Sequence, residues 1–254
     1  MHDRARDAAV TAPAADASSG EPLLVVDRLV AGYDKSEVLF GVSLHVRPGE
    51  VVAVLGHNGA GKTTLLKAIC GLLRPRGGEV SFGGERITNR DTASNVEDGL
   101  VFSPADAAVF RELPVLDNLA LGGFTERDGQ ARQQRLRDVL ELFPILAQRE
   151  RQVAGTLSGG ERRMLSIGIA LMSRPRMILL DEPSNGIAPG LVDRIFAQVR
   201  ELARAEGIAV VLVEQNVRSA LRVADRAYFM RSGRMILEEP ADVALARGEW
   251  WDLF

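Results

Sequence analysis

Gly56-His57-Asn58-Gly59-Ala60-Gly61-Lys62-Thr63 is the stretch that decides the fold, because it fits the pattern G-x-x-x-x-G-K-[ST]. The apolar residues 51–55 before it predict a buried strand, and residues 64–69 after it predict a helix. In such a strand-to-helix loop, backbone N–H groups and the helix dipole converge on a phosphate chain. Lys62 would reach the β- and γ-phosphates, and the Thr63 hydroxyl would bind Mg²⁺. The alternative is a glycine-rich turn with a surface lysine.

Length and composition predict a globular chain with a sizeable core, in one large domain or two lobes. It has 254 residues, of which 46% are hydrophobic. The 31 basic and 34 acidic residues are interspersed and give a net charge of −3, so nothing indicates a nucleic-acid partner. Cys70, the single cysteine, cannot form an internal disulfide. We expect it to be a core residue in a reducing compartment, with a reactive thiol as the alternative.

Residues 1–21 predict a disordered tail, because they are rich in Ala, Asp and Ser and lack the apolar core of a secretory signal. The longest apolar runs, residues 177–180 and 208–213, have the length of strands. They fall far below the roughly 20 residues that span a bilayer. We therefore expect a soluble, cytoplasmic chain, and any membrane span would belong to another polypeptide.

The order of the remaining patterns indicates an α/β core with a helical insertion. Residues 23–29 and 42–46 predict strands joined by a turn-rich loop that carries Tyr33. The Tyr33 ring can stack on a nucleobase, or it is a half-buried loop tyrosine. After a strand at residues 99–103, apolar residues recur at three- and four-residue spacing from 115 to 172, which predicts helices.

A second anion-binding pattern, Leu157-Ser158-Gly159-Gly160-Glu161, precedes a predicted helix at residues 162–172. Ser158 stands where an N-cap residue is expected. The two glycines leave backbone N–H groups open at a helix start, which attracts an anion. An ordinary capped helix is the alternative.

Two acids end the apolar strand predicted at residues 177–180. Asp181 would face the crevice at the carboxyl edge of the sheet and hold Mg²⁺, directly or through water. Glu182 would polarise a water for attack on the γ-phosphate. A solvated turn is the alternative. Further on we expect a helix at 191–205, a strand at 208–213 and a C-terminal hairpin; Trp250 and Trp251 pack either on the domain or on a partner.

Residues from about 23 to 240 resemble the nucleotide-binding subunit of ABC transporters. Tyr33, the phosphate loop, the 157–161 motif and Asp181-Glu182-Pro183-Ser184 carry the resemblance, in this order. Residues 56–64, 170–175 and 213–216 are more narrowly similar to the ATP-binding components of branched-chain amino-acid importers, and also to urea and amide importers. The resemblance implies a P-loop NTPase (RecA-like) core with an antiparallel β subdomain. It also implies one nucleotide-binding domain at residues 22–254, with a helical subdomain inserted at about 105–172.

The resemblance also implies the roles of the site residues and the partners. Two such subunits, identical or related, would close head to tail over ATP and Mg²⁺, beneath membrane permease subunits that meet a solute-binding protein. The chain would then lie on the cytoplasmic face of the membrane. Lys62, Glu182 and Gln215 would be catalytic, and Thr63 and Asp181 would bind the metal. The nucleotide would be bound by Tyr33, Gly56, His57, Asn58, Gly59, Ala60, Gly61, Lys62, Thr63 and Thr64, and across the dimer by Ser158, Gly159, Gly160 and Glu161.

This sequence departs from the family pattern at two positions. Gln215 stands where many members have histidine; its amide donates a hydrogen bond but cannot titrate, so we expect less change of activity around neutral pH. Ala105 stands where a glutamine or glutamate is expected to sense Mg²⁺ and the membrane subunits, with Asp106 as the neighbouring substitute. The departure predicts a weakened or rewired coupling loop with intact ATP binding.

Two other functions remain open at this level. A stand-alone ABC ATPase acting on ribosomes or DNA usually carries two phosphate loops, whereas this chain carries one. A degenerate partner that binds ATP but hydrolyses it poorly is favoured by Ala105 and opposed by Glu182. Neither the solute nor the choice between homodimer and heterodimer is specified by these residues.

Overall fold

The computed structural model describes residues 20–253, apart from the side chains of Pro189 and Trp251, so the predicted tail of residues 1–21 lies almost wholly outside the described residues. The strands are β1 (Leu24–Tyr33), β2 (Ser36–Val46), β3 (Val51–Leu55), β4 (Gly77–Phe82), β5 (Glu85–Arg86), β6 (Leu100–Ser103), β7 (Met177–Asp181), β8 (Ala209–Glu214), β9 (Arg226–Arg231) and β10 (Arg234–Pro240). The helices are α1 (Lys62–Ile69), α2 (Thr92–Glu97), α3 (Val115–Gly122), α4 (Gly129–Leu142), α5 (Pro144–Ala147), α6 (Gly159–Met172), α7 (Pro189–Glu206), α8 (Val217–Leu221) and α9 (Ala241–Arg247), with 3-10 turns Ala154–Thr156 and Trp251–Leu253. Within residues 20–253, none of the helices combines the length and apolarity that crossing a bilayer requires.

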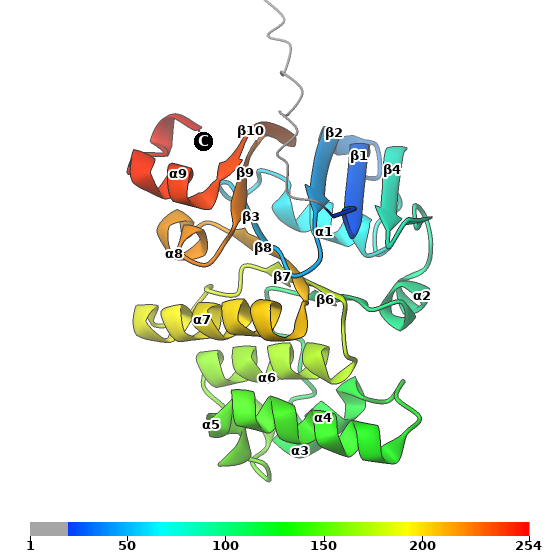
Figure 1. Ribbon diagram of the computed structural model, residues 1–254, viewed down its shortest axis with the longest axis vertical. Coiled ribbons are helices and arrows are strands. Elements are labelled where there is room, and N and C mark those ends of the chain that lie inside the picture. The colour runs from blue at the N-terminus through cyan, green and yellow to red at the C-terminus, as the bar shows by residue number, and fades with distance from the viewer. Residues whose placement is uncertain (1–19, 254) are drawn as a thin grey trace, which may run out of the picture.

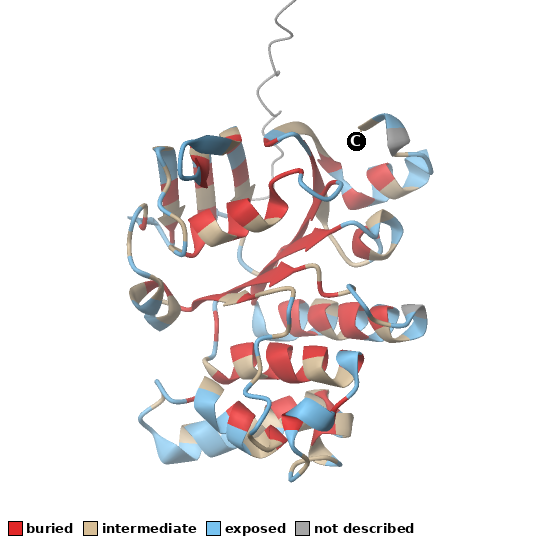
Figure 2. Ribbon diagram, turned by 180° about the vertical axis from the view of Figure 1, so that it is seen from behind, coloured by how far each residue is buried: buried red, intermediate tan, exposed pale blue. Residues whose placement is uncertain are grey.

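A sheet in the order β10-β9-β3-β8-β7-β6 forms the centre of the molecule (Figure 1). Strands β9, β3, β8, β7 and β6 are parallel, and β10 pairs antiparallel with β9. Every residue of β3, β7 and β8 is buried, as Figure 2 shows for the central strands. Continuous apolar runs are typical of parallel strands that are covered on both faces. The predicted α/β core is therefore confirmed.

The two faces of the central sheet belong to two separate cores. In β3, Val52 and Val54 point into a core shared with α1 and the antiparallel sheet β2-β1-β4-β5. The alternate residues Val51, Ala53 and Leu55 point into a core shared with α6 and α7. This alternation follows from the two-residue period of a strand. As a result, the phosphate loop that follows β3 begins at a strand that is covered on both faces.

The first hairpin differs from the predicted loop at residues 31–35. Strand β1 continues through Tyr33, because Ala31 and Gly32 pair with Leu39 and Glu37 of β2, and only residues 34–35 form the turn. Small residues such as Ala31 and Gly32 carry no strand signal of their own, so the ladder of backbone hydrogen bonds overrode the local sequence. Tyr33 is therefore the last residue of a strand and not a loop residue.

Helices α3 to α6 lie together on the side of the sheet away from the antiparallel strands (Figure 1). They occupy residues 115–172, where the sequence predicted helical periodicity. Residues 105–114, which the predicted insertion also included, form no helix. They connect β6 to α3 as an irregular segment, and Asn118 of α3 fixes it by bonding both the N–H and the carbonyl of Phe110, at 2.7 and 3.0 Å.

Candidate functional site

The phosphate loop connects β3 to α1 in a conformation that requires its glycines. Gly61, at the N-cap of α1, has a φ of 108°, a region that side chains with a Cβ rarely adopt. A Cβ on Gly56 would lie 2.5 Å from the Met230 carbonyl oxygen of β9. The loop is thus packed tightly on its surroundings, and neither of these two glycine positions leaves room for a side chain. The predicted strand, glycine loop and helix are all present, although α1 begins at Lys62, two residues earlier than predicted.

Lys62 lies across the phosphate loop with its ammonium group buried. Its Nζ donates to the carbonyl oxygens of Gly56 and His57 at 2.8 and 3.1 Å, and only 4% of its side chain is exposed. The same Nζ lies 3.2 Å from Oε1 of Glu182. The structure thereby brings together two residues that lie far apart in the sequence and that the motif analysis had assigned to one reaction.

Thr63 and Asp181 meet at the carboxyl edge of the sheet. The Thr63 hydroxyl donates to Oδ1 of Asp181, the last residue of β7, at 3.0 Å. Burial raises the pKa of the Asp181 carboxyl, and the hydrogen bond from Thr63 partly offsets the effect. A hydroxyl and a carboxylate side by side are the hard oxygen donors that Mg²⁺ prefers. The two residues assigned to the metal therefore fit that ion.

Glu182 follows β7 in a left-handed conformation, with a φ of 42°. Few non-glycine residues adopt this region, and such strain is concentrated at functional sites. Its backbone N–H donates to the Val213 carbonyl at 3.0 Å, which anchors the turn to β8. The turn directs the Glu182 carboxylate toward the Lys62 ammonium group.

Glu214 is a site residue that the sequence analysis did not identify. It is the last residue of β8, it is 1% exposed, and its carboxylate accepts from the Ser184 N–H and hydroxyl at 2.8 and 2.7 Å. The N–H groups of Gln215 and Asn216 add bonds of 3.1 and 3.3 Å. Burial raises the pKa of this carboxyl, against these donors. Glu214 fixes the loop after Glu182, and its only signal in the sequence was an acid that closes an apolar strand.

The predicted N-cap at Ser158 is confirmed. Ser158 Oγ accepts from the Glu161 N–H at 3.3 Å, and Glu161 Oε2 accepts from the Ser158 N–H at 2.8 Å. Arg149 pairs with the other Glu161 oxygen at 3.0 Å. Glu161 is therefore engaged in its own helix cap, whereas Ser158 and Gly159 are exposed to solvent. The second anion site that the sequence predicts would lie at the start of α6, on a different element from Lys62.

Gln215 and Trp250 lie beside the phosphate loop. The exposed Gln215 and the partly buried Trp250 line a cavity of about 200 Å³ together with Gly56 and His57. The Trp250 indole Nε1 donates to the Ala244 carbonyl of α9 at 2.9 Å. Of the two packing alternatives for Trp250, packing on its own chain is the one observed.

Two further predicted residues lie at the margin of this site. Tyr33, 45% exposed, ends the hairpin whose β2 packs on the phosphate loop, where Leu39 would lie 3.0 Å from a Cβ on Gly61. Asp106 is exposed and Ala105 half-buried, in the segment after β6. The Tyr33 side chain is thus open to solvent, and position 105 has only a methyl group to offer.

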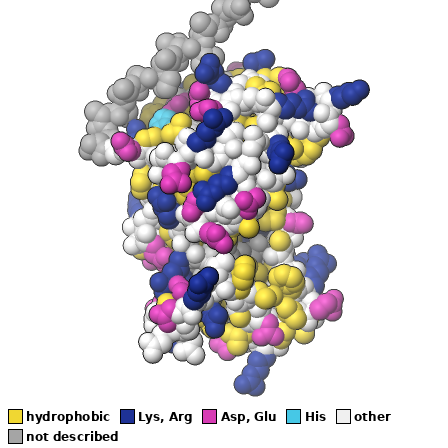
Figure 3. Space-filling model, turned by 90° about the vertical axis from the view of Figure 1, so that its right-hand side faces the viewer, with side chains coloured by type: hydrophobic (Ala, Val, Ile, Leu, Met, Phe, Trp, Pro, Cys, Tyr) yellow, Lys and Arg dark blue, Asp and Glu magenta, His cyan; other side chains and the backbone are white. Residues whose placement is uncertain are grey.

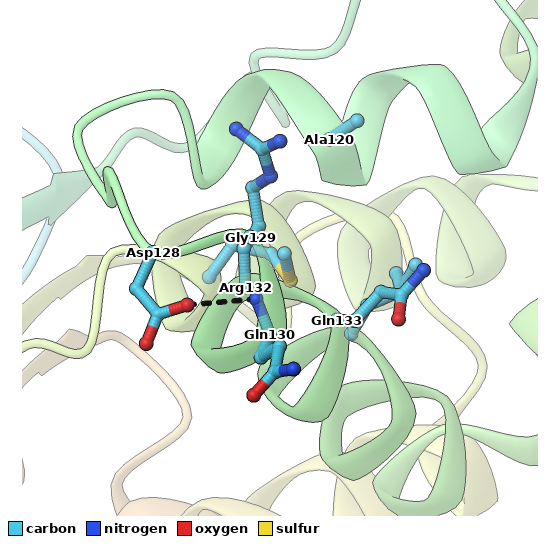
Figure 4. Close-up of a pocket in the computed structure, with 8 residues that line it drawn as sticks. Ala120, Asp128, Gly129, Gln130, Arg132 and Gln133 are labelled. Atoms are coloured by element: carbon cyan, nitrogen blue, oxygen red, sulfur yellow. Dashed lines mark hydrogen bonds between the residues drawn. The ribbon is translucent and has the colours of Figure 1, made fainter.

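A larger cavity of about 640 Å³ lies between α3 and α4 (Figure 4). It is lined by Ala120, Asp128, Gly129, Gln130, Arg132, Gln133, Leu136 and Met172. Asp128 caps α4 by accepting from the Gln130 N–H at 2.9 Å, the bond drawn in Figure 4. None of these lining residues is one to which the sequence assigned chemistry.

One face of the molecule combines mixed charge with exposed apolar side chains (Figure 3). Basic and acidic side chains alternate over this face, without a patch of one sign, and hydrophobic side chains gather in its lower part. Among the large apolar residues that the described chain exposes are Phe110 (58%), Leu121 (42%) and Phe124 (75%), all before α4. Clustered exposed apolar groups are typical of protein contact surfaces.

Comparison with known proteins agrees with this geometry. The ABC transporter family matches residues 39–185. The high-affinity branched-chain amino acid transport ATP-binding protein BraG of Pseudomonas aeruginosa is 41% identical over 91% of this chain and 99% of its own length. The lipopolysaccharide export system ATP-binding protein LptB of Haemophilus influenzae is 36% identical over 84% of this chain and 89% of its own. The dimeric ATP-binding cassette MJ0796 bound to ADP and Pi superimposes with a TM-score of 0.77 at 25% identity, covering 86% of this chain and 98% of that one.

Proposed function

The chain belongs to the ABC transporter family, and on this premise we propose that its ATP hydrolysis energises import of a branched-chain amino acid or a related small polar solute. As a member of this family it is a nucleotide-binding ATPase. The observation that carries the import proposal is the 41% identity to BraG over 99% of that protein. Import of urea or amides is the closest variant of the same function.

We further propose that ATP binds on the phosphate loop, with Mg²⁺ held by Thr63 and Asp181. The 3.0 Å contact between these residues supports this assignment, because it places a hydroxyl oxygen and a carboxylate oxygen side by side as donors for one ion. Bound there, Mg²⁺ would neutralise charge on the β- and γ-phosphates. The backbone N–H groups from Gly56 to Thr64 would hold the phosphates, and the exposed Tyr33 ring would stack on the base.

The chain's own residues would then perform the hydrolysis. Lys62 would leave the Gly56 and His57 carbonyls and bind the phosphate oxygens. Glu182, released from Lys62, would accept a proton from the attacking water, and the P–O bond to ADP would break as the bond to water forms. The Gln215 amide would donate to the γ-phosphate from the end of β8.

A second subunit would complete the site. Ser158, Gly159 and the backbone N–H of Gly160 would contact the γ-phosphate bound by the partner, with Glu161 holding the helix cap behind them; the solvent exposure of Ser158 and Gly159 at the start of α6 supports this. The dimeric state of MJ0796 with ADP and Pi supports such an assembly. Permease subunits would dock on the exposed apolar residues near Phe110 and Phe124, at the cytoplasmic face of the membrane. Residues 22–254 would act as one nucleotide-binding domain, with the helices α3 to α6 as its inserted subdomain.

The proposal is tested by deleting the gene in its own organism and measuring uptake of labelled leucine. The deletion is complemented with the wild-type chain, with Glu182→Gln and, as a matched control, with Glu85→Gln, since the Glu85 side chain is 80% exposed in the antiparallel sheet. We expect the wild type and Glu85→Gln to restore uptake and Glu182→Gln to fail. Undiminished uptake in the deletion strain would contradict the assignment to branched-chain amino acids.

The similarity to LptB supports one second candidate, an exporter of lipid-linked material. The same deletion strain distinguishes the two functions, because an export defect would alter the cell surface and leave leucine uptake intact.

A further inference from the structure

Arg163 is a buried arginine on the second turn of α6, and its partners are backbone carbonyls. It is 2% exposed, its Nη1 donates to the Pro104 carbonyl at 2.7 Å, and its Nη2 donates to the Ala105 carbonyl. Within residues 20–253 it has no carboxylate partner within ion-pair distance. Buried guanidinium groups usually pair with an acid. Arg163 is unusual because it is buried and donates to two adjacent carbonyls of one loop, which indicates a role in holding that loop.

The loop that Arg163 holds is the one in which position 105 carries only a methyl group. Its strand, β6, pairs in parallel with β7, so residues 104–107 and the pair Asp181-Glu182 leave the sheet at the same edge. One turn beyond Arg163, Ser166 Oγ lies 3.2 Å from Ser103 Oγ and joins the same helix to the end of β6. Helix α6 is therefore attached to this edge at two successive levels.

The charges around Arg163 connect it to the acids of the site. Burial lowers the pKa of its guanidinium, and the negative charges of Asp181, Glu214 and Asp106 counter this effect. A cation that stays charged in this position stabilises the carboxylates at the ends of β7 and β8. Arg163 thus contacts the loop directly through hydrogen bonds and interacts with the acids at longer range through its positive charge.

We propose that Arg163 is a positioning residue that fixes residues 104–107 to α6 through their backbone, and so connects the anion site at Ser158-Gly159-Gly160 to the hydrolytic edge of the sheet. Arg163 holds this loop by its main-chain carbonyls. The position of the loop therefore does not depend on the side chain at position 105. A shift of the start of α6 on binding a phosphate is carried by Arg163 to the loop beside Asp181. The inference rests on the proposed function, in which that anion site binds the γ-phosphate.

Arg135 provides a matched control for a purely structural role. It is also buried, at 5% exposed, and its Nε donates to a carbonyl associated with α6, that of Leu171, at 2.8 Å. It pairs with Glu206 at 2.7 Å. Leu171 lies near the end of α6, so Arg135 braces the same helix far from residues 104–107.

The experiment compares Arg163→Met, Arg163→Lys and Arg135→Met in the full chain by hydrogen–deuterium exchange and by steady-state ATP hydrolysis. In Arg163→Met we expect the amides of residues 105–107 to exchange at least about tenfold faster, because two charge-assisted hydrogen bonds are lost. We expect kcat to fall between about twofold and about thirtyfold with KM for ATP unchanged, the range typical of residues that modulate coupling. Arg163→Lys keeps the charge and one hydrogen bond, so we expect smaller changes in loop exchange and in kcat. Arg135→Met is expected to lower the unfolding temperature and to leave loop exchange and kcat unchanged.

Unchanged exchange at residues 105–107 in Arg163→Met would overturn the proposal, and so would equal effects of Arg163→Met and Arg135→Met on kcat. If Arg163→Met does not fold, Arg163→Lys decides alone, since loop exchange and kcat equal to wild type would overturn the proposal as well. A wild-type chain that does not hydrolyse ATP would instead contradict the proposed function, and the exchange result would still test the positioning role.

Discussion

Replacing Glu182 by glutamine removes the negative charge that faces the Lys62 ammonium group across 3.2 Å. The two side chains are 14% and 4% exposed, so water screens the pair only weakly. This ion pair would compete with phosphate for Lys62, and the same carboxylate would repel the γ-phosphate. Glu182→Gln removes both obstacles and preserves the shape of the side chain.

The size of the effect follows from the partners that Lys62 keeps. Its bonds to the Gly56 and His57 carbonyls remain, and only the charged contact to Glu182 is lost. A hydrogen bond to a charged group contributes about 1.5 kcal/mol at the lower end of the usual range. Since about 1.4 kcal/mol corresponds to a factor of ten, we expect ATP to bind about tenfold more tightly. Loss of the general base should at the same time lower kcat by about 10² to 10⁴.

The assay is a titration with a fluorescent ATP analogue in EDTA, so that neither metal nor hydrolysis contributes to the measured Kd. Glu85→Gln, an equally neutralising change at an exposed position, controls for the change in net charge. Affinity that is unchanged or weaker in Glu182→Gln would refute the competition for Lys62, even if hydrolysis disappeared.

Three further predictions concern other parts of the chain. Burial raises the pKa of the Asp225 carboxyl, but hydrogen bonds from Arg200 outweigh burial and hold that pKa below its usual value. The carboxylate therefore stabilises the fold above about pH 4, and this stabilisation is lost as the pH falls through the lowered pKa. Asp225→Asn should lower the thermal unfolding midpoint at pH 7, by an amount that shrinks below about pH 4; a gap that is constant with pH would contradict this. Burial raises the pKa of the Cys70 thiol to about 11. At pH 8 this thiol should therefore react with a thiol reagent about a hundredfold more slowly in the folded chain than in urea. Equal rates would disprove the core position of Cys70. Ala105→Gln should change basal or transporter-stimulated ATPase, and identical rates in both would exclude a weakened coupling loop at this position.

The fold was predictable from the sequence wherever a local pattern determined it. The glycines of residues 56–61 specified a turn between a strand and a helix, and the apolar runs of β7 and β8 specified buried parallel strands. Proximity of Lys62 to Glu182 and of Thr63 to Asp181 then followed, because the carboxyl ends of the parallel strands β3 and β7, which flank β8, lie at one edge of the sheet. The roles of these residues in hydrolysis stay predictions.

The contacts that sequence reasoning missed depend on packing between distant elements. Glu214 appeared in the sequence only as an acid at the end of an apolar strand, since only the fold shows that four donors converge on its carboxylate. Arg163 appeared as one of two consecutive arginines on a helix, and helix periodicity alone could not show that it reaches residues 104 and 105. Side-chain partners across a sheet edge are set by tertiary distances of a few ångströms, which the pattern of apolar residues does not encode.

The backbone attachment of residue 105 changes what the missing glutamine implies. A loop that is held in place by its side chain loses its position when that side chain is shortened to a methyl group. Such a loss would favour the degenerate partner that binds ATP but hydrolyses it poorly. Here the Pro104 and Ala105 carbonyls are held by Arg163 whatever stands at position 105, so the loop keeps a fixed place beside Asp181. Ala105 alone therefore does not argue for an inactive subunit. Glu182 lies in contact with Lys62 and Thr63 with Asp181, so the residues to which hydrolysis is assigned lie together at one edge of the sheet.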